Sequence, residues 1–199
     1  GVPRLDLDDL PAGLAEALRP RVERLGYLGE FFRVAGNQPE ALAGFVAYTE
    51  ACKAALPPRL TELIALTVST ATGSAYERHQ HERLALELGF GEAWVRAVVE
   101  VDPLHADGLD AVERAVQPLV LRLVDGIGRD ASAEMAAVEA VLTAPELVAV
   151  LLTVGRYLAH AVVVNAMALA PPVPSPLAPP PPAPPPPPAS SSLAPAAPS

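Results

Sequence analysis

The chain has 199 residues, 51% of them hydrophobic, and a formal net charge of −9 at pH 7. This length suits a single domain, and the hydrophobic fraction is enough to bury a sizeable core. The 14 lysine and arginine residues stand against 23 aspartate and glutamate residues and form no basic cluster. We therefore expect no nucleic-acid partner, because no patch exists that would neutralise phosphates.

Cys52 is the only cysteine of the sequence, which excludes an intrachain disulfide, a Cys-x-x-Cys redox pair and a structural zinc cage. A cytoplasmic location is expected, since the first residues are acidic where an export signal would be basic and then apolar. The single Lys53 beside 13 arginines is typical of a GC-rich bacterial genome. The apolar stretch 147–170 contains Arg156, so it predicts a buried helix and not a membrane span.

The first half of the chain is predicted to be helical, without the alternation of hydrophobic and polar residues that indicates a strand. A first helix over 12–18 should stop near Pro20, and a second should end at Gly36 in a left-handed cap. A third begins at Pro39, carries Cys52 on its inward stripe and ends at two prolines. Further helices are predicted over 58–72, 74–89 and 92–99.

Three more helices are predicted in the second half, over 109–124 with a kink at its proline, 133–142 and 146–168. Thr143 and Glu146 form a capping box before the last helix. That helix is apolar on most sides, which is typical of a helix enclosed by its neighbours. The expected fold class is therefore all-α, a compact multi-helix bundle over residues 1–170.

The last 29 residues, 171–199, hold 15 of the chain's 24 prolines and no charged side chain. Proline cannot donate a backbone hydrogen bond, so a segment this rich in proline cannot form a helix or a packed core. We expect a disordered or polyproline tail that adds nothing to the stability of the domain.

Two carboxylates, a hydroxyl and an imidazole lie within one short stretch, as Glu62, Ser74, Glu77 and His81. Glu77 and His81 are four residues apart and therefore share a helix face. Two short helices would bring Glu62 to the same place. Such a group can move protons without a cofactor.

Each of these residues also has a structural interpretation. Ser74 followed three residues later by Glu77 is a capping box, in which each side chain satisfies a free backbone N–H at a helix start. Glu62 would otherwise lie on an exposed helix face. His81 would be a surface histidine, although His79 fits that description better because it lies on another face of the helix.

Three aromatic residues and a metal site are open questions. His160 is either a core histidine or a second wall of a pocket, and Tyr76 and Tyr157 have the same two interpretations. Two glutamates and His81 would make a facial set for iron or manganese. Their spacing matches no known metal motif, so we expect neither a metal ion nor a cofactor.

The segment LPPRLTELIALTVSTATGSAYERHQHERLALELGF resembles the signature region of the carboxymuconolactone decarboxylase and alkyl hydroperoxidase D-like superfamily. That superfamily places a glutamate twelve residues before a Cys-x-x-Cys-x-x-x-His pattern, and Glu62, Ser74, Glu77 and His81 stand at the matching positions. The cysteine-free branch commonly reads Gly-Ser-x-Tyr-Glu here, as this chain does, and has a late helix similar to 157–166. The resemblance implies an all-helical fold that assembles as a homotrimer or homohexamer.

Two departures from the superfamily pattern limit what the resemblance implies. Both thiols are absent, so a peroxidase that passes electrons through a disulfide is not expected. Arg78 stands where this branch often has tryptophan, and the identity of the substrate therefore does not carry over.

We expect a cofactor-independent acid–base enzyme that decarboxylates, isomerises or cyclises a small carboxylated lactone or keto acid. His81 is the expected general acid–base, and Glu62 or Glu77 orients it and stabilises its charged form. Ser74 opens a helix whose free N–H groups favour negative charge. The substrate-binding residues are predicted to be Ser74, Tyr76, Arg59, Arg78, Tyr157 and His160, with Arg59 or Arg78 as the counter-charge of an acidic substrate.

The alternative is a catalytically silent binding or scaffold protein of the same fold and assembly. Its Pro-rich tail would be the interaction element, since polyproline segments lose little entropy on docking. Convergence of Glu62, Glu77 and His81 on an enclosed cavity would favour the enzyme, and divergent exposed side chains would favour the scaffold.

Overall fold

The computed structural model describes residues 1–103 and 107–178, and this part of the chain is all-helical, without a strand. After a short 3-10 turn at Leu7–Asp9, the helices are α1 (Ala12–Leu25), α2 (Glu30–Ala35), α3 (Pro39–Ala55), α4 (Pro58–Ala71), α5 (Ala75–Glu87), α6 (Glu92–Val99), α7 (Ala111–Gly126), α8 (Ser132–Glu139) and α9 (Ala144–Ala166). The predicted fold class is confirmed.

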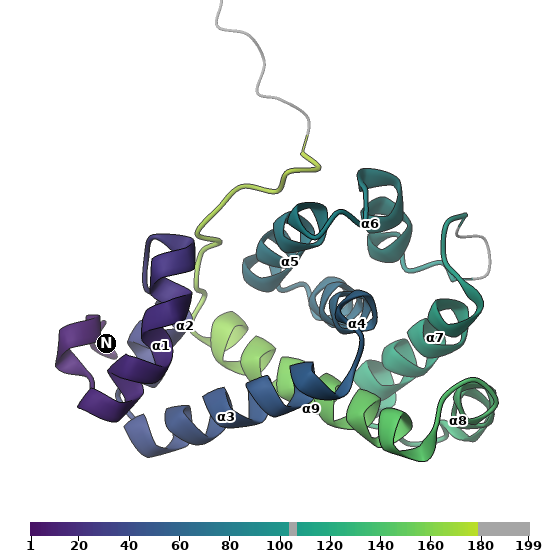
Figure 1. The fold of residues 1–199 in the computed structure, drawn as a ribbon, viewed down its shortest axis with the longest axis horizontal. Helices are drawn as coiled ribbons and strands as arrows, with labels where there is room; N and C mark the ends of the chain where they lie inside the picture. The colour runs from purple at the N-terminus through teal and green to yellow at the C-terminus, as the bar shows by residue number, and fades with distance from the viewer. Residues whose placement is uncertain (104–106, 179–199) are drawn as a thin grey trace, which may run out of the picture.

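Helix α4 lies at the centre of the molecule. Figure 1 shows it nearly end-on, with α5, α6, α7 and α9 arranged around it. Every residue from Leu60 to Ser69 is buried, including Glu62. A proline at its first turn, Pro58, starts the helix without losing a hydrogen bond, because that N–H would be unpaired in any case. Polar side chains of this helix must therefore find their partners inside the protein.

The N-terminal helices form a second apolar cluster beside this core. Leu14 and Leu18 of α1 pack with Phe31 of α2, Leu42 of α3 and Val164 of α9. In Figure 1 these helices lie together at one end of the molecule, next to the C-terminal half of α9. This packing brings α1 and α3 toward the inner face of α5.

Helix α9 is long and apolar enough to cross a membrane by length and composition alone, with 56% of its most apolar window buried in this structure. Its inward side packs against α3, α4 and α7. It therefore serves here as a core helix, as predicted. The Thr143 backbone N–H and hydroxyl both donate to the Glu146 carboxylate, at 2.8 and 2.7 Å, so the predicted capping contact is present.

Two predictions about the N-terminal helices were wrong. Helix α1 continues through Pro20 to Leu25, because a proline inside a helix removes one hydrogen bond and the remaining hydrogen bonds can carry the helix past it. The left-handed cap lies at Gly26, with φ of 80°, and not at Gly36, whose φ is −57°. Glycine at 36 is instead required by close packing, since a Cβ there would lie 2.5 Å from a side-chain carbon of Leu10.

The joint between α4 and α5 determines where the candidate residues meet. Gly73 has φ of 66°, in the left-handed region that favours glycine. The Ser74 backbone N–H donates to the Ser69 carbonyl at 2.8 Å, which closes the end of α4. The reversal of direction within so few residues packs α5 against α4.

The start of the predicted tail packs against α5. The Val173 carbonyl lies 3.1 Å from Nδ1 of His79, and the Ser175 hydroxyl donates to the Glu82 carboxylate at 2.5 Å. Leu177 is partly buried against the main core. Residues 171–178 thus make contacts that the proline content did not predict, and the rest of the predicted tail, 179–199, lies outside the described residues.

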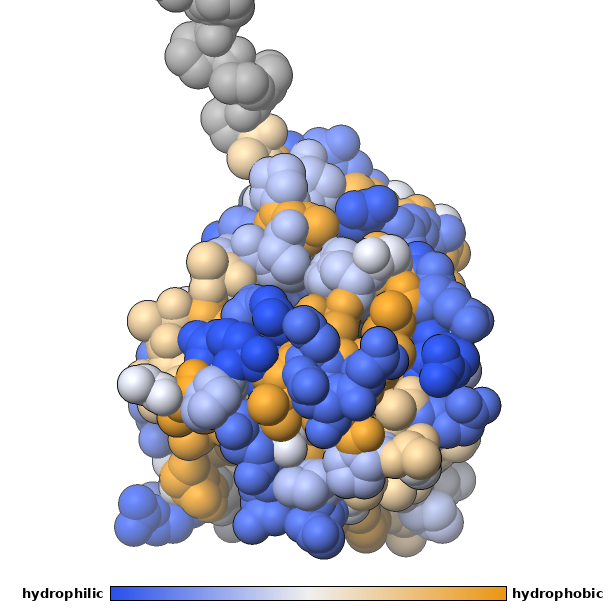
Figure 2. Space-filling view, turned by 90° about the vertical axis from the view of Figure 1, so that its left-hand side faces the viewer, coloured by the Kyte–Doolittle hydropathy of each residue, from blue (hydrophilic) through white to orange (hydrophobic). Residues whose placement is uncertain are grey.

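Exposed apolar residues follow one stripe along the outer side of α9. Val148, Leu152 and Val162 are 52%, 48% and 67% exposed. Gly155 and Ala159, also exposed, lie between them at spacings of three or four residues, so all five share one helix face. By contrast, Figure 2 shows a face over the N-terminal helices on which hydrophilic residues predominate and hydrophobic ones lie in small groups between them.

We propose that another copy of the chain covers this exposed stripe of α9. The superfamily resemblance predicts that the assembly is a trimer or hexamer. Light scattering at micromolar concentration should report an oligomer. The Val162→Glu variant should shift the equilibrium from oligomer toward monomer, because assembly would bury an unpaired charge. Ile127→Glu is the control, since Ile127 is 73% exposed but lies between α7 and α8. A monomeric wild-type protein would contradict the proposal.

Candidate active site

Glu62 and His81 form a short ion pair between α4 and α5. Oε2 of Glu62 lies 2.7 Å from Nδ1 of His81, and both side chains are largely buried. A carboxylate inside the core is costly unless it is paired and hydrogen-bonded. The imidazole of His81 therefore supplies the pairing and the hydrogen bond that the buried Glu62 carboxylate requires. Glu62 in turn fixes the orientation of the ring.

Glu77 is surrounded by three basic side chains. Its Oε2 accepts a hydrogen bond from Nη1 of Arg156 at 3.3 Å and lies 3.7 Å from Nε2 of His81. Its Oε1 lies 3.4 Å from Nδ1 of His160. Helices α5 and α9 thus share one buried carboxylate, and the two predicted glutamates lie on opposite sides of the His81 ring.

His81 is held in its charged form. Burial alone would lower its pKa, but the attraction of Glu62, the hydrogen bond with Glu62 and the nearby Glu77 carboxylate outweigh burial and raise the pKa from 6.5 to about 9. At neutral pH the side chain is an imidazolium. Because the folded state binds this proton more tightly, the stability that it contributes is complete below pH 6.5 and is lost as the pH rises through about 9.

His160 is neutral at the same pH. Its ring stacks on Phe31 with a centroid distance of 3.8 Å, and burial, which outweighs the attraction of Glu77, lowers its pKa to about 3. For Glu77, burial would raise the pKa, but His160, His81 and Arg156 together hold it well below its usual range. Near neutrality the charges that keep Glu77 ionised are those of Arg156 and His81.

Arg156 is a site residue that sequence reasoning did not assign. Its Nε donates to the Thr49 hydroxyl at 3.1 Å, and its guanidinium lies over the rings of Phe45 and Tyr157 at 5.1 and 4.2 Å. The one signal in the sequence was its position four residues before His160, inside an otherwise apolar helix.

These side chains line a cavity of about 90 Å³ between α1, α3, α5 and α9. Of the predicted residues, Tyr76, Glu77, His81, Tyr157 and His160 contribute to its wall. The edge of Tyr157 meets the His81 ring, with 5.2 Å between centroids and an interplanar angle of 81°. His160 therefore has both of the roles considered for it, a buried core residue and a second wall.

Four cationic side chains line the same cavity, Arg21 and Arg24 from α1, Lys53 from α3 and Arg156 from α9. Burial, followed by the repulsion of nearby arginines, lowers the pKa of Lys53. The local sequence does not indicate the cations of α1 and α3, because only the packing of the N-terminal helices brings them to the cavity.

Residues 39–119 match the model of the carboxymuconolactone decarboxylase family. This segment contains all four positions of the predicted motif, Glu62, Ser74, Glu77 and His81, and it folds as the predicted helices. The resemblance to the carboxymuconolactone decarboxylase and alkyl hydroperoxidase D-like superfamily is thus supported over this segment. No curated protein matches the sequence.

Solved structures of low sequence identity share the fold. A Cys-to-Ala variant of the debrominase Bmp8, in complex with 2,3,4-tribromopyrrole, aligns with a TM-score of 0.74 and 18% identity over 84% of this chain and 89% of that chain. An uncharacterized peroxidase-related protein from Ralstonia eutropha JMP134, with an alkylhydroperoxidase AhpD core, aligns with a TM-score of 0.74 and 18% identity. The alignment covers 86% of this chain and 93% of that chain. A protein of unknown function from Agrobacterium tumefaciens aligns with a TM-score of 0.63 and 19% identity over 70% of this chain and 96% of that chain.

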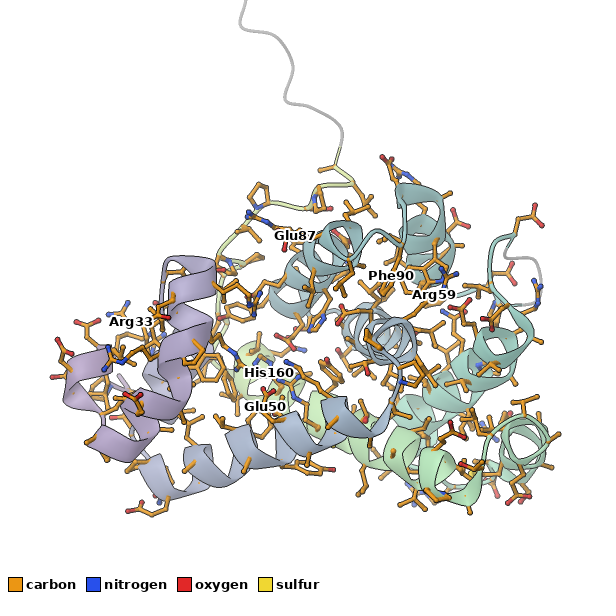
Figure 3. The ribbon with its side chains drawn as sticks, in the orientation of Figure 1. Arg33, Glu50, Arg59, Glu87, Phe90 and His160 are labelled. Atoms are coloured by element: carbon orange, nitrogen blue, oxygen red, sulfur yellow. The ribbon has the colours of Figure 1, made fainter. Side chains whose placement is uncertain are left out.

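Two arginines predicted to bind substrate do not line the cavity. Nε of Arg59 lies 2.6 Å from Oε1 of Glu113, and its guanidinium lies over Trp94 at 4.8 Å. Figure 3 shows Arg59 beside Phe90, across α4 from His160. Arg78 pairs with Glu82 along α5 at 3.3 Å and is absent from the cavity wall. Their counter-charge role was wrong because each is held by a glutamate elsewhere.

The capping box predicted for α5 is also absent. Ser74 is the N-cap residue but makes no capping hydrogen bond, and its buried hydroxyl has no hydrogen-bond partner in the described part of the chain. The Glu77 carboxylate turns to Arg156, His160 and His81 instead of back to the helix start. Ser74 also does not line the cavity, so its predicted contact with substrate is not supported.

Two further features of the site concern Tyr76 and metal binding. The Tyr76 hydroxyl accepts a hydrogen bond from the Phe31 backbone N–H at 3.3 Å, and burial raises its pKa to about 12. This phenol is therefore used to attach α2 to α5. Among residues 1–103 and 107–178, no group of three histidine, cysteine, aspartate or glutamate side chains is arranged to hold a metal ion.

The Ser74→Ala variant tests whether the Ser74 hydroxyl caps α5 or lacks a hydrogen-bond partner. Loss of a cap would cost about 1 kcal/mol of unfolding free energy. We expect no loss, or a small gain, because the substitution removes a buried hydroxyl that lacks a partner. Urea denaturation of wild-type and variant protein measures the difference, and a clear destabilisation with an unchanged m-value would contradict the expectation.

Proposed function

We propose that the protein is a cofactor-independent acid–base enzyme acting on a small carboxylated lactone or keto acid. The reaction is a decarboxylation or a related isomerisation or cyclisation. The observation that carries this proposal is the charged His81 ring, held between Glu62 and Glu77 in the wall of a cavity that four cationic side chains also line. The convergence of these residues favours an enzyme over a scaffold.

The arrangement supports His81 as a general acid. Nδ1 is occupied by Glu62 at 2.7 Å, which leaves the Nε2 proton as the one that a substrate would receive. Nε2 is 3.7 Å from Glu77, beyond hydrogen-bond length, so its proton is not tightly held. With a pKa of about 9, His81 is protonated at neutral pH and acts as a donor at the start of the cycle.

The cations supply the attraction that an acidic substrate requires. Decarboxylation, lactone opening and enolisation all develop or move negative charge on the substrate, and fixed positive charges in an enclosed site stabilise it. Arg21, Arg24 and Arg156 take the part that the sequence had given to Arg59 or Arg78. A cavity of about 90 Å³ suits a substrate smaller than the drug-sized ligands of typical pockets.

A thiol peroxidase is not part of the proposal. A relay through a disulfide needs two cysteines, and the sequence has only Cys52, which is buried on α3. The superfamily neighbours named as a debrominase and as peroxidase-related share the fold at identities that carry no activity to this chain. Action in a bacterial cytoplasm, without a cofactor, stays a prediction from the sequence.

Substitution of His81 tests the acid–base proposal. A screen of carboxylated lactones and β-keto acids for carbon dioxide release or isomerised product comes first. On any hit, His81→Gln should lower kcat/KM by at least about 10²-fold, since glutamine has a similar size but cannot transfer a proton. Glu62→Gln should have a comparable effect, because it removes the charge that keeps the ring protonated.

His79→Gln is the matched control for this series. It is the same substitution two residues earlier on α5, where the imidazole faces the Val173 carbonyl and does not line the cavity. It should keep wild-type activity. Full activity in His81→Gln, with circular dichroism unchanged, would contradict the proposal. Absence of any activity over the whole screen would favour the catalytically silent alternative.

A further inference from the structure

Lys53 occupies an unusual place in this chain. It is the only lysine of the sequence, which otherwise uses arginine for its basic residues. It lies on α3 and lines the same cavity as His81 and Tyr157. Its side chain is 36% exposed, so it is partly accessible and partly removed from solvent.

The charges around Lys53 favour its neutral form. Arg21 and Arg156 line the cavity with it and repel a third positive charge. Its ion-pair partner is Glu50, at 3.7 Å from Nζ, and the same oxygen of Glu50 accepts a hydrogen bond from Arg21 at 3.0 Å. Glu50 is 58% exposed, so solvent screens what attraction it offers.

A lysine beside other cations is the arrangement that makes an amine nucleophilic at neutral pH. The three arginines of the cavity cannot take this part, because guanidinium groups stay protonated in proteins. Burial and the neighbouring arginines lower the pKa of Lys53, which agrees with its surroundings. The cavity therefore holds one amine able to attack a carbonyl, and cations able to hold a carboxylate.

We propose that Lys53 forms a Schiff base with a β-keto acid in this cavity and that decarboxylation proceeds through it. This inference rests on the proposed acid–base function and narrows its substrate class to acids that carry a ketone on the carbon next but one to the carboxylate. His81 then has a defined task, which is to protonate the carbon that loses carbon dioxide.

The steps balance without an oxidant or reductant. The neutral Lys53 amine adds to the ketone carbon, and the carbinolamine takes up a proton from solvent and loses water to give a protonated imine. The bond to the carboxylate breaks, carbon dioxide leaves, and its electron pair moves into the imine to form an enamine. His81 donates its Nε2 proton to the enamine carbon. Water then hydrolyses the imine, which releases the ketone and Lys53 and returns to solvent the proton taken up by the carbinolamine. Solvent also returns the proton to His81.

Borohydride trapping with acetoacetate as the probe tests the inference. The full chain is treated with sodium borohydride in the presence and absence of acetoacetate, and intact mass and peptide mapping follow. We expect one reduced adduct, on the peptide that contains Lys53, only when acetoacetate is present. Lys53→Arg keeps the charge but should lose the adduct. His79→Gln, outside the cavity, should keep it.

Carbon dioxide release, measured in parallel over the β-keto acid panel, separates this inference from the proposed function. An adduct on Lys53, together with loss of carbon dioxide release in Lys53→Arg, supports both. Carbon dioxide release without an adduct, undiminished in Lys53→Arg, overturns the Schiff base and leaves the acid–base function standing. Failure of both measurements on well-folded protein overturns both.

Discussion

The buried Glu77 carboxylate is the interaction on which the rest of the site depends. It joins α5 to α9 through Arg156 and His160, and it lies beside His81, which Glu62 ties to α4. Paired charges in a protein interior are costly to separate, because removal of one partner leaves the other uncompensated. Helices α4, α5 and α9 therefore have to keep their relative positions for this network to remain satisfied. Their rigidity follows from electrostatics as much as from the apolar core.

The same network determines what chemistry the cavity can support. Two carboxylates flank one imidazole, and this arrangement makes His81 an acid at neutral pH rather than a base. The arginines on α1 offset the negative charge that two buried glutamates would otherwise present to an acidic substrate. Lys53 differs from the arginines beside it, because it alone can lose its proton and act as a nucleophile. Proton donor, anion site and amine thus come from helices that are far apart in the chain.

Local patterns in the sequence predicted most of the fold and part of the site. Helical periodicity and proline positions gave α4 to α9 to within a few residues, and the spacing of Glu62 and His81 predicted their meeting. The capping role of Glu77 and the substrate role of Arg59 failed for a common reason. Each side chain takes the partners that tertiary packing offers, and spacing along the sequence does not rank them. The approach of Arg21 to the cavity depends on how α1 packs against α3 and α9, which no short-range pattern encodes. Pro20 also shows the limit of local patterns, since α1 continues past a residue that usually ends a helix.

The most direct test of this account is the proton affinity of His81 itself. Nuclear magnetic resonance titration of its ring nitrogens, assigned by comparison with His81→Gln, gives the pKa without need of a substrate. The structure predicts a pKa of about 9 in the wild-type protein, with Nδ1 bonded to Glu62, and a lower pKa in Glu62→Gln. A pKa near the ordinary value of 6.5 that does not change in Glu62→Gln would contradict the account, because His81 would then be neither held nor charged by the two glutamates.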